Sequence, residues 1–134
     1  MPFAGVPEFD AALKRIVTAA EKATGDAVMT GAHLVEGATK VRASGRPGPR
    51  VVSGSHRRSV HVEGPKTAGT QVSAQIGPSM IYSRRLELGF TGSDAIGRSY
   101  HTAAFPSLTP GLADTMPQLE QVFVRAWLGA IETA

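Results

Sequence analysis

Residues 9–41 read FDAALKRIVTAAEKATGDAVMTGAHLVEGATKV, and this stretch decides the fold. Apolar side chains recur in it at intervals of three, four or seven residues, which is the spacing of one face of an α-helix. The sequence therefore predicts one long N-terminal helix with a single apolar face. The residues that form this face are Phe9, Leu13, Ile16, Ala20, Ala27, Leu34, Ala38 and Val41.

The charges at the two ends of this stretch agree with a helix. Glu8 and Asp10 lie in its first turn behind Pro7, and Lys40 and Arg42 lie in its last turn, as the helix dipole favours. Three glycines inside the helix each cost about 1 kcal/mol relative to alanine, so they indicate a bend, a close crossing with another helix, or a break. These glycines are Gly25, Gly31 and Gly37.

A basic, glycine- and proline-rich segment follows the helix. Residues 43–55 read ASGRPGPRVVSGS, a composition that predicts a flexible loop. Residues 40–66 hold seven basic residues against one acid, Glu63, whereas the whole chain has a net charge of only +3. Guanidinium groups here could reach DNA phosphates or the carboxylates of a protein partner, and the alternative is a solvated loop that binds nothing specific. The candidate residues are Arg46, Arg50, Arg57 and Arg58.

The middle of the chain predicts short strands and a short helix. Residues 59–63 and 70–76 alternate between apolar and polar side chains, and Gly64, Pro65 and Gly69 between them favour a hairpin. Residues 80–90 have helical spacing with Gly89 as the stop. Residues 99–102 form a weaker strand candidate.

A second amphipathic helix is predicted at the C-terminal end. Its apolar positions run from Leu112 to Ile131, and Pro117 is expected in the first turn of its main part or at a kink. Trp127 and Phe123 on this helix are expected in the core. The predicted fold class is α+β, with a long N-terminal helix, a small antiparallel β-sheet with a short helix, and this C-terminal helix.

The length of 134 residues predicts a single domain, residues 1–134, with the flexible basic loop at about 43–55. A small sheet leaves unpaired edges, which favours covering by further copies of the chain and hence a homo-oligomer. No apolar run approaches the roughly 18 residues that span a bilayer, so we expect a soluble, unexported protein that makes no membrane contact.

The sequence holds no recognisable catalytic or cofactor motif. Nucleophile-elbow, phosphate-loop and dinucleotide-binding patterns do not occur, and cysteine is absent. We therefore predict no enzymatic activity, no metal site and no cofactor. The four histidines are too scattered in sequence to predict a tetrahedral metal site; they are His33, His56, His61 and His101.

Glu87 lies between Leu86 and Leu88 on the predicted short helix. One interpretation is a buried carboxylate that caps a helix or meets a partner, paired with Arg84 or Arg85. The alternative is an acid that simply faces solvent.

Several short motifs, taken in order, resemble the tail-component family of long-tailed bacteriophages, also called tail-completion or neck proteins. Gly54-Ser55-His56-Arg57-Arg58-Ser59-Val60 is similar to the start of that family's first strand. Ile76-Gly77, Tyr82-Ser83, Leu86-Glu87-Leu88-Gly89-Phe90 and Phe105-Pro106-Ser107-Leu108 follow in the family's order. The resemblance covers roughly residues 9–131, and it departs from the family at Ser83, Leu88 and Phe90.

This resemblance implies a structural protein of the virion, located in the neck or at the top of the tail of a siphophage and in the host cytoplasm during assembly. It implies a homo-oligomeric ring, for which a hexamer is one stoichiometry, that joins the head connector to the tail-tube or tail-terminator proteins around double-stranded DNA in the channel. The interface residues that it suggests are Tyr82, Glu87, Gly89 and Phe90. The alternative function, from the basic segment alone, is a small nucleic-acid-binding protein.

Overall fold

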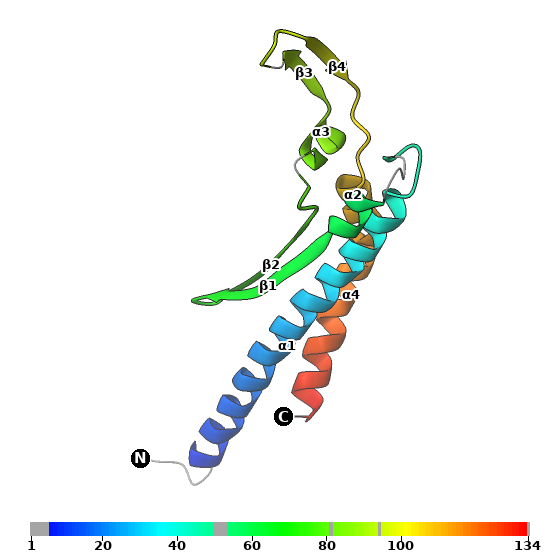
Figure 1. Ribbon diagram of the computed structural model, residues 1–134. Helices are drawn as coiled ribbons and strands as arrows, with labels where there is room; N and C mark the ends of the chain where they lie inside the picture. Colours follow the sequence, from blue (N-terminus) through cyan, green and yellow to red (C-terminus); the bar gives the residue numbers. More distant parts are fainter. Residues whose placement is uncertain (1–5, 50–53, 81, 94, 134) are drawn as a thin grey trace.

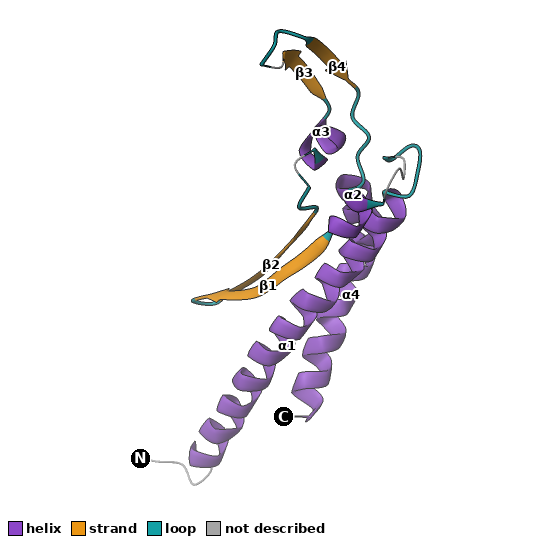
Figure 2. Cartoon of the chain, viewed as in Figure 1, coloured by secondary structure: helices purple, strands orange, loops and turns teal. Residues whose placement is uncertain are grey.

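The structure is a computed structural model that describes residues 6–49, 54–80, 82–93 and 95–133. Two long helices lie side by side, and two β-hairpins project from them (Figure 1, Figure 2). The predicted α+β class is confirmed. In chain order the elements are α1 (Val6–Arg42), α2 (Ser55–Ser59), β1 (His61–Ala68), β2 (Gln71–Gly77), α3 (Ser83–Leu88), β3 (Phe90–Ser93), β4 (Ser99–Thr102) and α4 (Leu108–Thr133).

The predicted N-terminal helix is confirmed as one unbroken element, α1, that runs through all three glycines. At Gly31 the reason is a close helix crossing, because a β-carbon there would lie 3.0 Å from the Leu119 side chain of α4. Gly111 of α4 is tighter still, since a β-carbon would lie 2.7 Å from Thr39 Oγ1 and 2.8 Å from Thr39 N. Small residues at these two positions allow α1 and α4 to approach closely.

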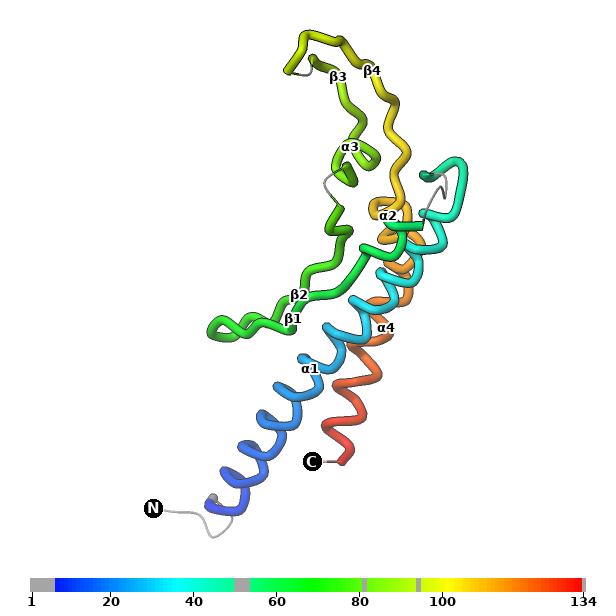
Figure 3. Tube along the Cα trace, viewed as in Figure 1, coloured from blue at the N-terminus to red at the C-terminus, as the bar shows by residue number. Residues whose placement is uncertain are grey.

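The two helices are antiparallel, and their contacts fix the register. Thr39 lies against Gly111, Gly31 lies against Leu119, and Trp127 Nε1 donates a hydrogen bond of 2.9 Å to Thr24 Oγ1. Continued along the pair, this register brings the last turn of α4 beside residue 17 or so of α1. The first turns of α1 therefore extend beyond the end of α4 (Figure 3). We call residues 7–17 the overhang.

The first hairpin differs from the predicted one at both ends. Ser59 belongs to the short helix α2, where its Oγ donates to the His56 carbonyl oxygen, so the strand begins only at His61. Gly64 and Pro65 lie within β1 at an irregularity in the ladder and do not form the turn, which comes at Gly69. Gly64 has φ +126°, and a β-carbon there would lie 3.0 Å from the Ser73 carbonyl oxygen.

The second hairpin pairs the predicted strand Ser99–Thr102 with β3, which the sequence pattern did not predict. The strands thus form two separate two-stranded sheets, β1–β2 and β3–β4, where one small sheet was expected. Gly89 ends α3 as predicted. Glycine is favoured there because φ is +76° and because a β-carbon would lie 2.8 Å from the Thr102 carbonyl oxygen.

The C-terminal helix begins at Leu108, ahead of the predicted start at Leu112. Pro117 consequently lies inside α4 and not in its first turn. Trp127 is 42% exposed and Phe123 is half-buried, so the prediction that these aromatic side chains form the core is wrong for Trp127.

The core of the chain is made of small side chains. Among the described residues the buried apolar ones are alanines and valines, and the largest fully buried side chains are Val60, Thr39 and Ser107. The accessible surface is 9267 Å². A compact monomer of 14.0 kDa would expose about 6,700 Å², so the excess is roughly 2,500 Å². The fold leaves many of its large apolar side chains uncovered.

Candidate assembly surfaces

One uncovered apolar surface lies on α4. Gly111 and Thr115 are buried against α1, whereas large apolar side chains on another side of α4 are 42–57% exposed. They lie on one side of the helix, on which Glu120 occupies the turn between Met116 and Val124. We call this set the α4 outer face. Its members are Met116, Val124, Trp127, Leu128 and Ile131.

The overhang carries a second uncovered apolar surface. Phe9, Leu13 and Val17 are 65%, 44% and 56% exposed. They continue the same stripe of α1 that further along carries Ala27 and Gly31, which are buried. The stripe is therefore covered by α4 in the middle of α1 and open at its N-terminal end.

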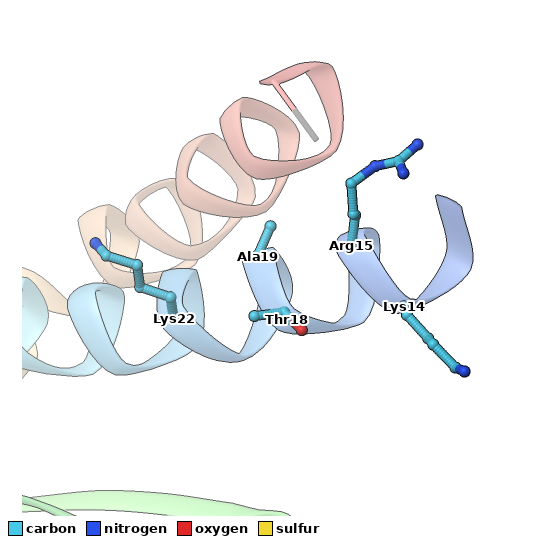
Figure 4. A pocket seen from close by; sticks show the side chains of 5 residues that line it. All are labelled: Lys14, Arg15, Thr18, Ala19 and Lys22. Carbon is cyan, nitrogen blue, oxygen red and sulfur yellow. The ribbon is translucent and has the colours of Figure 1, made fainter. Parts of the chain in front are cut away.

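A shallow groove near the overhang is lined by basic side chains (Figure 4). Lys14 forms an ion pair of 3.0 Å with Asp10, and Lys22 forms one of 2.7 Å with Asp26, which raises the pKa of Lys22. The charged ends of Lys14 and Arg15 point in different directions in Figure 4 and do not converge on one point. The groove thus has no preformed site for an anion.

The basic segment is partly engaged within the chain. The Arg46 guanidinium lies 3.5 Å from the centre of the Phe105 ring, and its Nη1 donates to the Gly48 carbonyl oxygen at 3.0 Å. Arg57 Nη1 donates to Ser44 Oγ at 3.0 Å. These contacts link residues 44–48 to α2 and to the segment before α4.

The three candidate arginines within the described residues do not form one site. Arg57 and Arg58 are neighbours on α2 and both are exposed, whereas Arg46 is held on Phe105. Arg50 lies outside the described residues. The cation–π contact of Arg46 could not be predicted, because Phe105 is 59 positions away in the sequence.

Arg42, the last residue of α1, also turns to α4. Its Nε and Nη2 donate to the two carboxylate oxygens of Asp114, each at 2.7 Å. This bidentate pair raises the pKa of Arg42 and lowers the pKa of Asp114, through the hydrogen bonds first and the opposite charge after them. A basic residue that the sequence assigned to the helix dipole thus joins the two long helices.

Glu87 caps α4, in agreement with the capping interpretation. Its carboxylate accepts hydrogen bonds from the backbone N–H groups of Ser107 at 3.0 Å and Leu108 at 2.7 Å, and a longer one from Thr109 at 3.4 Å. These are donors that an isolated helix start leaves unsatisfied. The side chain comes from α3, so the cap fixes the angle at which α3 meets α4.

The other residues suggested by the resemblance lie around the same joint. Tyr82 precedes α3 and is 41% exposed. The Phe90 ring has the Arg85 guanidinium 3.9 Å from its centre and the Tyr100 ring 6.4 Å away across the β3–β4 hairpin. Gly89 provides the turn between α3 and β3. The four residues therefore share one region of the chain, but they do not converge on a single cavity.

His56 makes a contact that the sequence did not reveal. Its Nδ1 lies 2.9 Å from Ser83 Oγ, its Nε2 is buried without a hydrogen-bond partner, and burial lowers the pKa of the imidazole although the Glu87 charge acts in the opposite sense. Ser83 is only 3% exposed. The pair therefore joins α2 to α3 and does not present a nucleophile at the surface.

No cluster of three or more histidine, aspartate or glutamate side chains with metal-binding geometry occurs among the residues described here. Within the same ranges, no helix has the length and apolar character needed to cross a membrane. Comparison of the whole chain with protein-family models, with curated proteins and with known structures gives no match.

Proposed function

We propose that this chain is the subunit of a homo-oligomeric ring that joins the head connector to the tail tube of a long-tailed bacteriophage. The observation that carries the proposal is the uncovered apolar surface of the two long helices. The whole chain, projecting hairpins included, exposes roughly 2,500 Å² more than a compact monomer, an area that about three ordinary interfaces of about 800 Å² per partner would cover.

The projecting hairpins support assembly in a second way. Each sheet has only two strands, so each strand keeps one unpaired edge. The β3–β4 hairpin stands beyond the end of the helix pair, and Ile96 at its turn is 74% exposed (Figure 1). Projecting hairpins of this kind can contact neighbouring proteins along a tube, here the connector on one side and tail-tube or tail-terminator proteins on the other.

The phage context is supported by the ordered sequence landmarks. Two of them, Leu86-Glu87-Leu88-Gly89-Phe90 and Phe105-Pro106-Ser107-Leu108, meet in the folded chain. The Glu87 carboxylate accepts from Ser107 and Leu108, and the Phe105 N–H donates to the Leu86 carbonyl oxygen at 2.7 Å. Landmarks that are far apart in sequence therefore build one joint, which is a reason to treat them as parts of one pattern.

The nucleic-acid-binding alternative has weaker support. Its basic segment uses Arg46 and Arg57 for contacts within the chain. If DNA binding were the main function, affinity for duplex DNA would fall steeply with salt. Arg57→Ala combined with Arg58→Ala would then reduce the salt slope by about 1 for each phosphate that is no longer neutralised.

The proposal is tested by light scattering and native mass spectrometry of the purified protein, alone and mixed with connector and tail-tube proteins. A closed oligomer, formed alone or on either partner, is the expected result. A monomer that stays monomeric with both partners would contradict the proposal.

A further inference from the structure

We infer that the overhang of one copy packs against the α4 outer face of the next copy, and that this pairing is the main subunit contact of the assembly. The inference rests on the proposed function and names the surfaces that form the ring. Its occupant is a second copy of this chain.

The overhang belongs to the face of α1 that packs against α4 within the same chain. Phe9, Leu13 and Val17 continue the stripe whose later positions Ala27 and Gly31 receive α4 within the same chain. An apolar helix stripe can pack on the apolar face of a second helix. The α4 outer face presents an exposed apolar helix surface on every copy, with larger side chains than the Gly111 and Thr115 side that α1 covers.

The two surfaces also match in size. The overhang is about 16 Å long and the stretch of α4 from residue 116 to 131 is about 22 Å long, at 1.5 Å per residue. Large apolar side chains line both stretches. Such a cluster at the centre of a standard interface would account for much of the uncovered area.

The overhang and the α4 outer face are different surfaces of one chain. In the proposed ring they pair heterologously, from each copy to the next, until the rotation closes; two copies that exchanged these surfaces reciprocally would form a twofold dimer. The overhang also lies beyond the end of its own α4, where another chain can reach it (Figure 3).

The chain contains no cysteine, so a direct test is available. Leu13→Cys protein is mixed with tagged Leu128→Cys protein and treated with a short bismaleimide cross-linker. Arg15→Cys, which lies on the opposite side of α1 at the same level, replaces Leu13→Cys as the matched control. Efficient linkage of Leu13→Cys to Leu128→Cys, and at least about tenfold less linkage of Arg15→Cys to Leu128→Cys, is expected.

A second pair of variants measures the contribution of the apolar contact. Leu13→Glu should weaken self-association at least about tenfold, equivalent to about 1.4 kcal/mol, while Thr18→Glu, which adds the same charge on another side of α1, should change it less than about threefold. Circular dichroism of each variant checks that the helices remain folded.

The outcomes separate this inference from the proposed function. An oligomer in which Leu13→Cys links to Leu128→Cys no better than Arg15→Cys does, or which tolerates Leu13→Glu, overturns the α1–α4 pairing and leaves the ring intact. A monomer under all conditions, with connector and tail-tube proteins present, overturns both.

Discussion

Replacing Glu87 should loosen the joint between α3 and α4. In Glu87→Ala, the N–H groups of Ser107 and Leu108 lose acceptors at 3.0 and 2.7 Å, and Ser107 is almost completely buried, so water cannot replace the carboxylate there. Hydrogen bonds to a charged group and the loss of a helix cap together correspond to about 2–3 kcal/mol of unfolding free energy. Glu87→Gln keeps an acceptor oxygen but loses the charge that faces the helix N-terminus, and should cost about 1 kcal/mol.

Urea unfolding and thermal melts, both followed by circular dichroism at one protein concentration, measure the two variants. For a chain of this size the expected decrease in melting temperature is about 3–5 °C per kcal/mol. Glu21→Gln is the matched control, because Glu21 is exposed on α1 and forms no ion pair within the described ranges; it should change stability by less than about 0.5 kcal/mol. A loss in Glu87→Ala no larger than that of Glu21→Gln would refute the capping role.

Gly111→Ala should destabilise the chain by about 2–3 kcal/mol, because the added methyl group meets Thr39. Gly37→Ala should instead stabilise α1 by about 0.5–1 kcal/mol, because the space around Gly37 is open. Thermal melts of the two variants compare these effects directly. Burial lowers the pKa of His56 below 6.5, so its contribution to stability is present above pH 6.5 and is lost as the pH falls through the folded-state value. His56→Gln should remove this part of the decrease in stability below pH 6.5. Hydrogen bonds to the Ser59 carbonyl oxygen and to Glu63 raise the pKa of His61. The contribution of His61 to stability is therefore present below pH 6.5 and is lost as the pH rises through the folded-state value. His61→Gln should remove this decrease in stability at rising pH, as the same pH-dependent melts would show.

The two long helices could be predicted because their signal is local and repeated. The α1 stripe extends over roughly ten turns, and no single glycine outweighs it. The Gly89 helix stop is also local, since only glycine readily adopts its φ of +76°. The sequence could even indicate a close helix crossing at Gly31, although not which side chain of α4 would fill the space.

The short elements were harder to predict from the sequence, because their positions depend on contacts with distant residues. A five-residue helix such as α2 gives no periodic signal, and the serine that ends it also alternates correctly for a strand. Residues 90–93 were not predicted as a strand, since Gly92 and the polar neighbours give no alternation, and the pairing with residues 99–102 is what makes them one. Gly64-Pro65 has the composition of a turn, yet the ladder continues past it through an irregularity.

The charged candidates show the same limit. Exposed arginines and an acid on a short helix are equally consistent with partner binding and with contacts inside the chain. Arg42 and Arg46 are held by Asp114 and Phe105, and Glu87 is held by α4, each across a long sequence separation. Charge density along the sequence therefore overstated how much of the basic segment is available to DNA or to a partner.

The apolar pattern has the opposite bias, because it overstated how much of each helix face the single chain buries. The spacing that predicted Trp127 in a core is the spacing of a covered helix face, yet the chain alone leaves Trp127 42% exposed. Likewise, the stripe beginning at Phe9 does not become polar where α4 ends. If α1 and α4 were complete as a pair, selection for solubility would favour polar residues at these positions. That they remain apolar over matching lengths is the physical reason to expect another copy of the chain there.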